Sequence, residues 1–156
     1  MQLSKNLSLK EVVKSNTATR LDIDNTPSEQ AINNLKGIAE HVFQPLRDRF
    51  GVPIGVSSGY RSPALNKAVN GSRTSQHMVG EALDIDADIY GGLSNKDIFE
   101  FIKDNLVFDQ MIWEFGDDES PAWVHVSYKS YGENRGRILK AYKDENKKTV
   151  YSVIFK

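Results

Sequence analysis

Two short stretches, residues 75–84 and 123–128, hold two of the three histidines of this 156-residue chain. The first stretch ends in a run with period two, in which Asp84 points away from the apolar residues on either side of it. The second stretch alternates in the same way and leaves His125 on its polar face. We therefore expect two half-buried strands, far apart in sequence, whose polar faces contribute to one site.

The residue types at this site predict zinc chemistry. His77 enters from a predicted loop, Asp84 and His125 come from strands, and the chain has no cysteine, so any zinc is held by nitrogen and oxygen ligands. Zinc-assisted hydrolysis needs three protein ligands, a fourth position open for water, and a carboxylate that takes the proton of that water. His41 lies in a predicted helix away from these stretches and is expected to be a packing or surface residue.

Glu114 is the candidate for the carboxylate. In residues 111–115 the apolar side chains take one face and leave Glu114 on the other. If the connection to the next strand runs from residue 117 to 122, Gly116 pairs with Trp123 and Glu114 lies directly opposite His125, with Cβ atoms about 5 Å apart. Trp123 shares the face of His125 and is a candidate wall of a substrate groove.

The remaining pattern predicts an α+β fold with one domain over residues 1–156, in which helices flank a mostly antiparallel central sheet. Residues 1–50 are predicted to be helical, 51–128 to form the metal-site core and 129–156 to form a C-terminal hairpin. Capping boxes are predicted at residues 8–11, 26–29 and 94–97. Helices are expected at 8–16, 26–50 with a kink or break at Pro45, 62–69 and 94–105, and strands at 52–60, 82–87, 111–115, 123–128, 138–142 and 150–155.

Charge and hydropathy narrow the class of partner. The formal net charge is −1, which gives no electrostatic basis for binding nucleic acid. The N-terminus has no apolar signal-peptide region and no run is long enough for a membrane span. We therefore expect a protein made in the cytoplasm without a signal peptide, not inserted into a membrane, and monomeric.

Four stretches together resemble the zinc D-Ala-D-Ala carboxypeptidase-type peptidases, whose fold is shared with the hedgehog signalling domain. These stretches are Ser58-Gly59-Tyr60-Arg61-Ser62, Ser75-x-His77-x-x-Gly80-x-Ala82-x-Asp84, Asp109-Gln110-Met111-Ile112-Trp113-Glu114 and Trp123-Val124-His125-Val126-Ser127. In order and spacing they cover roughly residues 52–128. The segment from Leu9 to Pro27 is similar to the phage and bacterial branch of the family.

The resemblance implies a Zn²⁺ site on His77, Asp84 and His125. It also implies that Arg61 binds a substrate oxygen and stabilises the developing oxyanion, and that Ser75 hydrogen-bonds to substrate.

Better-known members place an acidic residue about three positions before the last histidine, where this chain has Ser120, Pro121 and Ala122. That departure shifts the role of general base to Glu114, with Asp118 and Glu119 as weaker candidates. Asp86 and Asp88 are either solvated or orient a ligand histidine.

The implied substrate is a peptidoglycan stem peptide or cross-link, cut by D,D-carboxypeptidase, D,D-endopeptidase or L-alanyl-D-glutamate chemistry. The absence of a signal peptide favours a phage endolysin that reaches the cell wall after holin-type release. Two alternatives stay open: a zinc-stabilised interaction module without turnover, and a bacterial peptidase of cell-wall remodelling.

Overall fold

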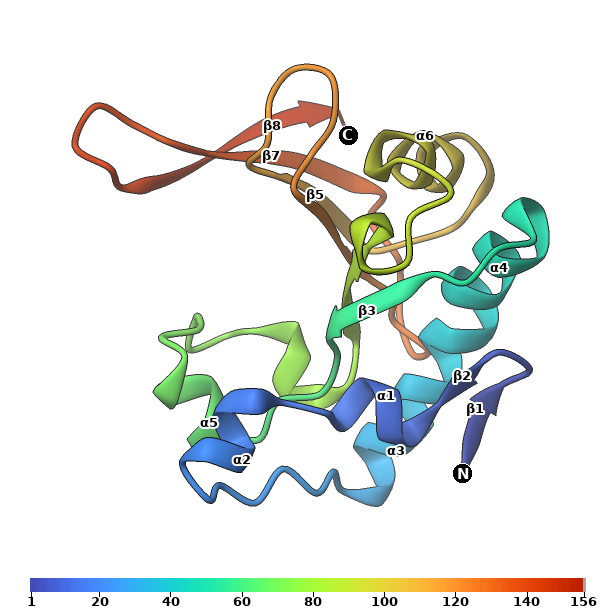
Figure 1. The fold of residues 1–156 in the computed structure, drawn as a ribbon, viewed down its shortest axis with the longest axis vertical. Coiled ribbons are helices and arrows are strands. Elements are labelled where there is room, and N and C mark those ends of the chain that lie inside the picture. The colour runs from blue at the N-terminus through green and yellow to red at the C-terminus, as the bar shows by residue number, and fades with distance from the viewer. Residues whose placement is uncertain (156) are drawn as a thin grey trace.

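A six-stranded mixed sheet forms the centre of the structure, a computed structural model that describes residues 1–155 (Figure 1). The strands are ordered β3-β4-β6-β5-β7-β8, and every neighbouring pair is antiparallel except β5 and β7, which are parallel. Their bounds are β3 Gly55–Ser58, β4 Ala82–Asp86, β5 Gln110–Glu114, β6 Trp123–Ser127, β7 Arg137–Lys143 and β8 Thr149–Phe155. The predicted α+β class is confirmed.

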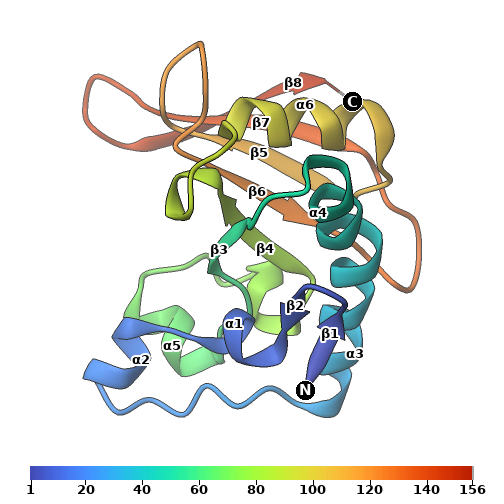
Figure 2. The ribbon, with the colours of Figure 1, turned by 45° about the vertical axis from the view of Figure 1, so that its right-hand side comes forward.

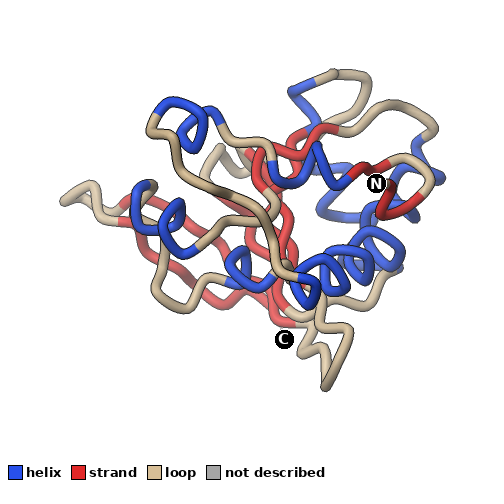
Figure 3. The backbone as a smooth tube through the Cα atoms, turned by 90° about the horizontal axis from the view of Figure 1, so that it is seen from below, coloured by secondary structure: helices blue, strands red, loops and turns tan. Residues whose placement is uncertain are grey.

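Short helices surround this sheet, so that the strands form a continuous band with helical segments on either side (Figure 3). The chain begins with a small two-stranded sheet, so the prediction that residues 1–50 are helical is wrong at its N-terminal end. The remaining elements are β1 Gln2–Ser4, β2 Leu7–Ser8, α1 Leu9–Val13, α2 Asn16–Arg20, α3 Glu29–Ile38, η1 Ala39–Phe43, α4 Gln44–Phe50, α5 Pro63–Ala68, η2 Gln76–Val79, η3 Ala87–Ile89 and α6 Asn95–Asn105.

Two of the three predicted capping boxes are present at helix starts, and the third is not. Those at the starts of α1 and α6 are formed as predicted, with the side chains of Ser8 and Ser94 accepting from backbone N–H groups. The predicted box over residues 26–29 is wrong. Ser28 caps α3 instead, because its hydroxyl accepts from the N–H of Ala31 at 3.1 Å and helical backbone begins only at Glu29.

Pro45 divides the long predicted helix. It sits in the first turn of α4, and the turn before it is the π-helical segment η1, where the N–H of Gln44 bonds to the carbonyl of Ala39. Proline has no N–H and its ring crowds the carbonyl four residues earlier, so the wider turn accommodates it without ending the helical path. The predicted disturbance at Pro45 is therefore present as a π-helical turn within a continuous helical path, not as a break.

The two faces of the sheet have different roles. One face packs on α3, η1, α4 and α6 and forms the main core, with Leu35, Phe43, Leu83, Ile98 and Val124 all buried. Figure 2 shows α6 and α4 along this side. The opposite face carries Asp84 and His125. Within residues 1–155, no helix has both the length and the apolar character needed to cross a bilayer.

Candidate metal centre

Strand pairing brings Asp84 and His125 together. Asp84 on β4 is the direct register partner of His125 on β6, so their side chains leave the sheet from the same face at the cross-strand spacing. Both strands are interior members of the sheet and are hydrogen-bonded on both edges. The backbone positions of these two side chains are therefore fixed by the sheet itself.

His77 reaches the same point from η2, a turn that is held against α3. Gly80 ends η2 with φ +76°, and a Cβ at this glycine would lie 2.5 Å from the carbonyl oxygen of Ala31 in α3. The side chain of Asn34 donates to the carbonyl of Val79 at 2.9 Å. Only glycine allows this approach, and the contact positions His77, which is 2% exposed.

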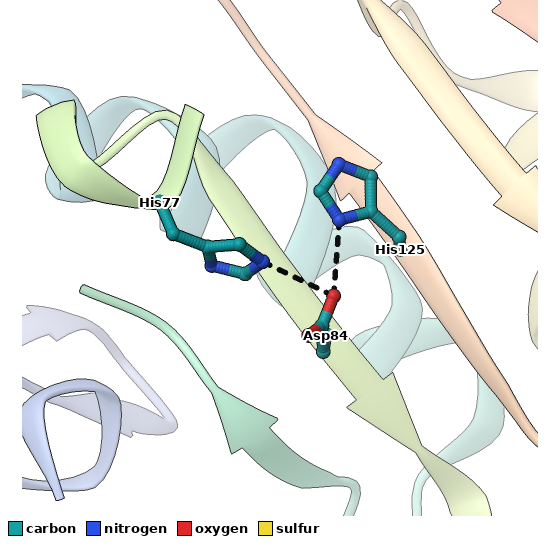
Figure 4. A group of neighbouring side chains, drawn as sticks. All are labelled: His77, Asp84 and His125. Carbon is teal, nitrogen blue, oxygen red and sulfur yellow. Dashed lines mark hydrogen bonds and ion pairs between the residues drawn. The ribbon is translucent and has the colours of Figure 1, made fainter. Parts of the chain in front are cut away.

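The three side chains converge on one oxygen (Figure 4). The Nε2 atom of His77 lies 3.2 Å from Oδ1 of Asp84, and Nδ1 of His125 lies 3.0 Å from the same oxygen. The three candidate ligand atoms all fall within 4.8 Å of one another. The structure thus brings together the three residues that the sequence predicted to be metal ligands.

The tautomer of His77 fits a metal ligand. Its Nδ1 atom lies 2.6 Å from the carbonyl oxygen of Gly59, which can only accept, so Nδ1 carries a proton and donates it. In neutral imidazole the other nitrogen then has a free lone pair, and this lone pair faces the acceptor oxygen of Asp84. A cation or an added proton is needed between them, and a donor set of two imidazole nitrogens and one carboxylate suits Zn²⁺.

The charge on Asp84 is strongly stabilised. Burial alone would raise the pKa of this carboxyl, but the facing rings of His77 and His125 outweigh burial and hold its pKa well below the ordinary value. Asp84 is therefore an anion throughout the physiological pH range, as metal binding requires.

Glu114 lies on the face of His125, although its predicted register is wrong. Glu114 pairs with Trp123, and His125 pairs with Ile112, so the strands are shifted by two residues from the expected pairing. The β5 strand ends early because Phe115 and Gly116 both have positive φ values, and the N–H of Ala122 closes the loop onto the carbonyl of Glu114. A shift of two keeps the side chain on its face, diagonal to His125.

The environment of Glu114 suits proton transfer near neutral pH. The residue is 8% exposed, and burial raises the pKa of its carboxyl to about 7, with His125 lowering the value and Asp84 raising it. A general base is most effective when its pKa lies near the operating pH. The alternatives Asp118 and Glu119 are both absent from the cleft lining, and Asp118 is 95% exposed and paired with Lys140 at 2.9 Å.

These residues line a single cleft of about 1160 Å³. Besides the three candidate ligands and Glu114, its wall includes the other site residues predicted from the sequence, Arg61, Ser75 and Trp123. Trp123 is half-buried, with its ring 5.5 Å from that of Phe115. The cleft is large enough for several residues of a peptide.

Arg61 projects into this cleft as a half-buried cation. Its backbone N–H donates to the carbonyl of His77 at 3.1 Å, which ties the segment that follows β3 to the ligand turn. Burial lowers the pKa of its guanidinium, and the charge of Asp84 counteracts that effect. Among the described residues, its buried Nε atom has no hydrogen-bond partner, so Arg61 retains a donor for an oxygen of a bound molecule.

Ser75 and Asp86 have structural contacts of their own. The Ser75 hydroxyl accepts from the N–H of His77 at 3.3 Å and caps η2. Asp86 accepts from the side chain of Asn95 at 3.0 Å, so it is Gly59, not Asp86, that orients a ligand histidine. His41 lies outside the site and stacks on Tyr128 with ring centroids 4.7 Å apart.

Asp109 is a supporting residue whose role the sequence did not reveal. It has no exposed surface, and its carboxylate accepts from the Arg135 backbone at 3.1 Å, from the Arg135 guanidinium in two bonds of 3.0 Å and from the Gln76 amide at 3.0 Å. Gln76 precedes the ligand His77. Asp109 begins one of the stretches that carry the family resemblance. Its role was not apparent from the sequence because its hydrogen-bond partners, Arg135 and Gln76, are distant in sequence.

Comparison with known proteins adds one positive finding. The model of the family described as Peptidase M15 matches residues 5–127, a range that contains all three candidate ligands, Arg61 and Glu114. No curated protein matches the chain.

Proposed function

This chain belongs to the peptidase M15 family, the zinc D-Ala-D-Ala carboxypeptidase-type peptidases, and from that membership we propose that it is a zinc-dependent peptidase acting on peptidoglycan peptides. His77, Asp84 and His125 hold the metal in this proposal. The observation that carries it is the convergence of two imidazole nitrogens on one buried carboxylate oxygen, at 3.2 and 3.0 Å, inside a cleft.

Bound zinc supplies a Lewis acid that polarises a peptide carbonyl and makes water nucleophilic near neutral pH. The protein supplies a group that transfers protons and a cation that stabilises the negative charge that develops on the substrate. Glu114 accepts a proton from the attacking water and returns it to the leaving amine, and its pKa of about 7 permits both steps. Arg61 places its guanidinium on the substrate oxygen that gains negative charge.

Substrate contacts extend from this centre along the cleft. In the proposal, Ser75 and Trp123 contact the peptide, because both line the same cleft as the candidate ligands. The family's relation to D-Ala-D-Ala peptidases supports a stem peptide or cross-link containing D-residues as substrate. The scissile bond is then a D,D bond or the L-alanyl-D-glutamate bond.

Mass spectrometry of fragments released from purified peptidoglycan tests this function and distinguishes the scissile bonds. Wild-type protein loaded with one equivalent of zinc is expected to release fragments with a new amino or carboxyl terminus. His77→Ala is expected to lose both stoichiometric zinc and fragment release. Release by a zinc-free His77→Ala protein would contradict the assignment.

Glu114→Gln separates an enzyme from a zinc-stabilised interaction module. The variant keeps the size of the side chain but cannot take a proton, so turnover is expected to fall about 10²- to 10⁴-fold while zinc stoichiometry stays at one. If the protein is instead an interaction module, neither wild type nor Glu114→Gln is expected to release fragments, although both bind zinc.

We place the protein biologically as an endolysin that reaches the wall from inside the cell. Expression in a bacterial host followed by permeabilisation of the membrane is expected to cause lysis with wild type and not with His77→Ala. Lysis by both proteins, or by neither, would contradict this placement.

A further inference from the structure

The C-terminal hairpin of β7 and β8 forms one wall of the cleft that contains the metal ligands. It follows the family match, which ends at residue 127, so the match assigns it no role. Four of its side chains line the same cleft as His77, Asp84 and His125: Leu139, Lys143, Thr149 and Tyr151. Figure 1 shows the hairpin extending past the end of β5 on the side of the molecule where α5 lies.

Strand register places Tyr151 in the same row as Glu114. Across neighbouring strands, Trp123 pairs with Glu114, Glu114 with Ala141, and Ala141 with Tyr151. Direct cross-strand partners point to the same face, so Trp123, Glu114 and Tyr151 all face the cleft. Ala141, the residue between Glu114 and Tyr151, has only a methyl group as its side chain, so no bulky group separates the carboxylate from the phenol.

The electrostatic environment of Tyr151 agrees with this placement. Burial raises the pKa of its phenol, and the negative charges of Glu114 and Asp84 raise it further. The phenol is therefore protonated and a hydrogen-bond donor at neutral pH. The residue is nevertheless 54% exposed, so a bound molecule has access to it.

We propose that Tyr151 is a substrate-binding residue that packs its ring against the peptide and donates a hydrogen bond from its hydroxyl to a peptide oxygen. The inference rests on the proposed peptidase function and adds a specificity determinant to it. An aromatic ring with one polar end suits this contact, because it offers a large apolar surface at one end and a directed donor at the other. Lys143, on the same face of the hairpin, lies 5.2 Å from the centre of the Phe115 ring and extends the wall.

Tyr142 provides a matched control on the same hairpin. It pairs with Val150 and, by alternation along β7, points to the opposite face from Ala141 and Lys143. It is 40% exposed, similar to Tyr151, and its hydroxyl lies 3.3 Å from that of Ser152. Tyr142→Phe therefore removes an equivalent hydroxyl that cannot reach the cleft.

The test measures equilibrium binding, so that it does not depend on turnover. Zinc-loaded Glu114→Gln protein is titrated calorimetrically with a soluble stem-peptide fragment purified from peptidoglycan, alone and combined with Tyr151→Phe, Tyr151→Ala or Tyr142→Phe. Loss of one hydrogen bond is expected to weaken the Kd about fivefold for Tyr151→Phe, and loss of the ring as well is expected to weaken it more for Tyr151→Ala. Tyr142→Phe is expected to leave the Kd unchanged, and zinc stoichiometry is expected to be one in all variants.

The outcomes separate this inference from the proposed function. If Tyr151→Phe and Tyr142→Phe give the same Kd as the parent, or lower affinity equally, the inference is overturned. If no fragment binds to the parent protein, it is also overturned. If wild type releases no fragments but the Kd depends on Tyr151, the peptidase assignment fails while the binding role of the hairpin is supported. In an active wild-type background, Tyr151→Phe is expected to raise KM more than it lowers kcat.

Discussion

The buried carboxylate of Asp109 is expected to be the most sensitive ionic position outside the metal centre. Asp109→Ala removes the acceptor for four hydrogen bonds, three from Arg135 and one from Gln76. Breaking a buried ion pair by removing one partner costs about 3–5 kcal/mol. The Arg135 side chain is 48% exposed and can be rehydrated, so we expect a loss at the lower end, about 3 kcal/mol in the free energy of unfolding.

Urea denaturation followed by circular dichroism measures this loss directly. In a domain of this size, about 3 kcal/mol corresponds to a fall of about 6–12 °C in Tm. Asp118→Ala is the matched control, because the same substitution there breaks an ion pair whose acid is 95% exposed; a change below about 0.5 kcal/mol is expected. Equal effects of the two substitutions would refute the view that the Asp109 network stabilises the fold.

The pH dependence gives a second test of the same residue. Burial raises the pKa of Asp109, but the hydrogen bonds from Arg135 and Gln76 outweigh burial and lower the pKa below its ordinary value. The stability that this carboxylate contributes is therefore fully present above its unfolded pKa of about 3.9 and is lost as the pH falls through the lower folded pKa. The difference between wild type and Asp109→Ala should shrink below about pH 4 and stay constant from pH 5 to 7; a difference that grows on acidification would contradict the sign.

Three further predictions concern the metal centre and its supports. Zinc at 100 times its Kd is expected to raise the free energy of unfolding of metal-free wild type by about 2.7 kcal/mol, with no such rise in thermal melts of His125→Ala. Gly59→Ala would place a Cβ 2.5 Å from the carbonyl oxygen of Val12, so a displaced Gly59 carbonyl, lower stability and at least tenfold weaker zinc binding by calorimetry are expected. Asn95→Ala removes bonds to Asp86, Ala87 and Ala122 from a side chain that is 2% exposed; urea denaturation should show a loss of about 2 kcal/mol.

Local patterns predicted the parts of this molecule that depend on neighbouring residues. The boxes at Ser8 and Ser94 involve residues three apart, and strand alternation alone identified the polar faces of Asp84, Glu114 and His125. Pro45 predicted a disturbance of the long helix, seen as the π-helical turn η1, for a covalent reason that holds in any context.

Features that depend on tertiary pairing were not predictable in the same way. The register of β5 against β6 was wrong because Phe115, a bulky residue, adopts a positive φ of 54° and ends the strand before the glycine. The partners of Asp109 lie 26 and 33 residues away, and the cleft position of Tyr151 requires the parallel pairing of β5 with β7. None of these relations leaves a period or spacing in the sequence.

The order of strands in the sheet gives the candidate metal ligands and Tyr151 different degrees of structural support. Asp84 and His125 lie on β4 and β6, whose neighbours on both sides hold them in register, whereas Tyr151 lies on β8, which has a neighbour on one side only. Substitutions in an edge strand perturb fewer hydrogen bonds than those in interior strands. Under the proposed function, substitutions in β8 would therefore alter the wall of the cleft while the candidate metal ligands keep their geometry.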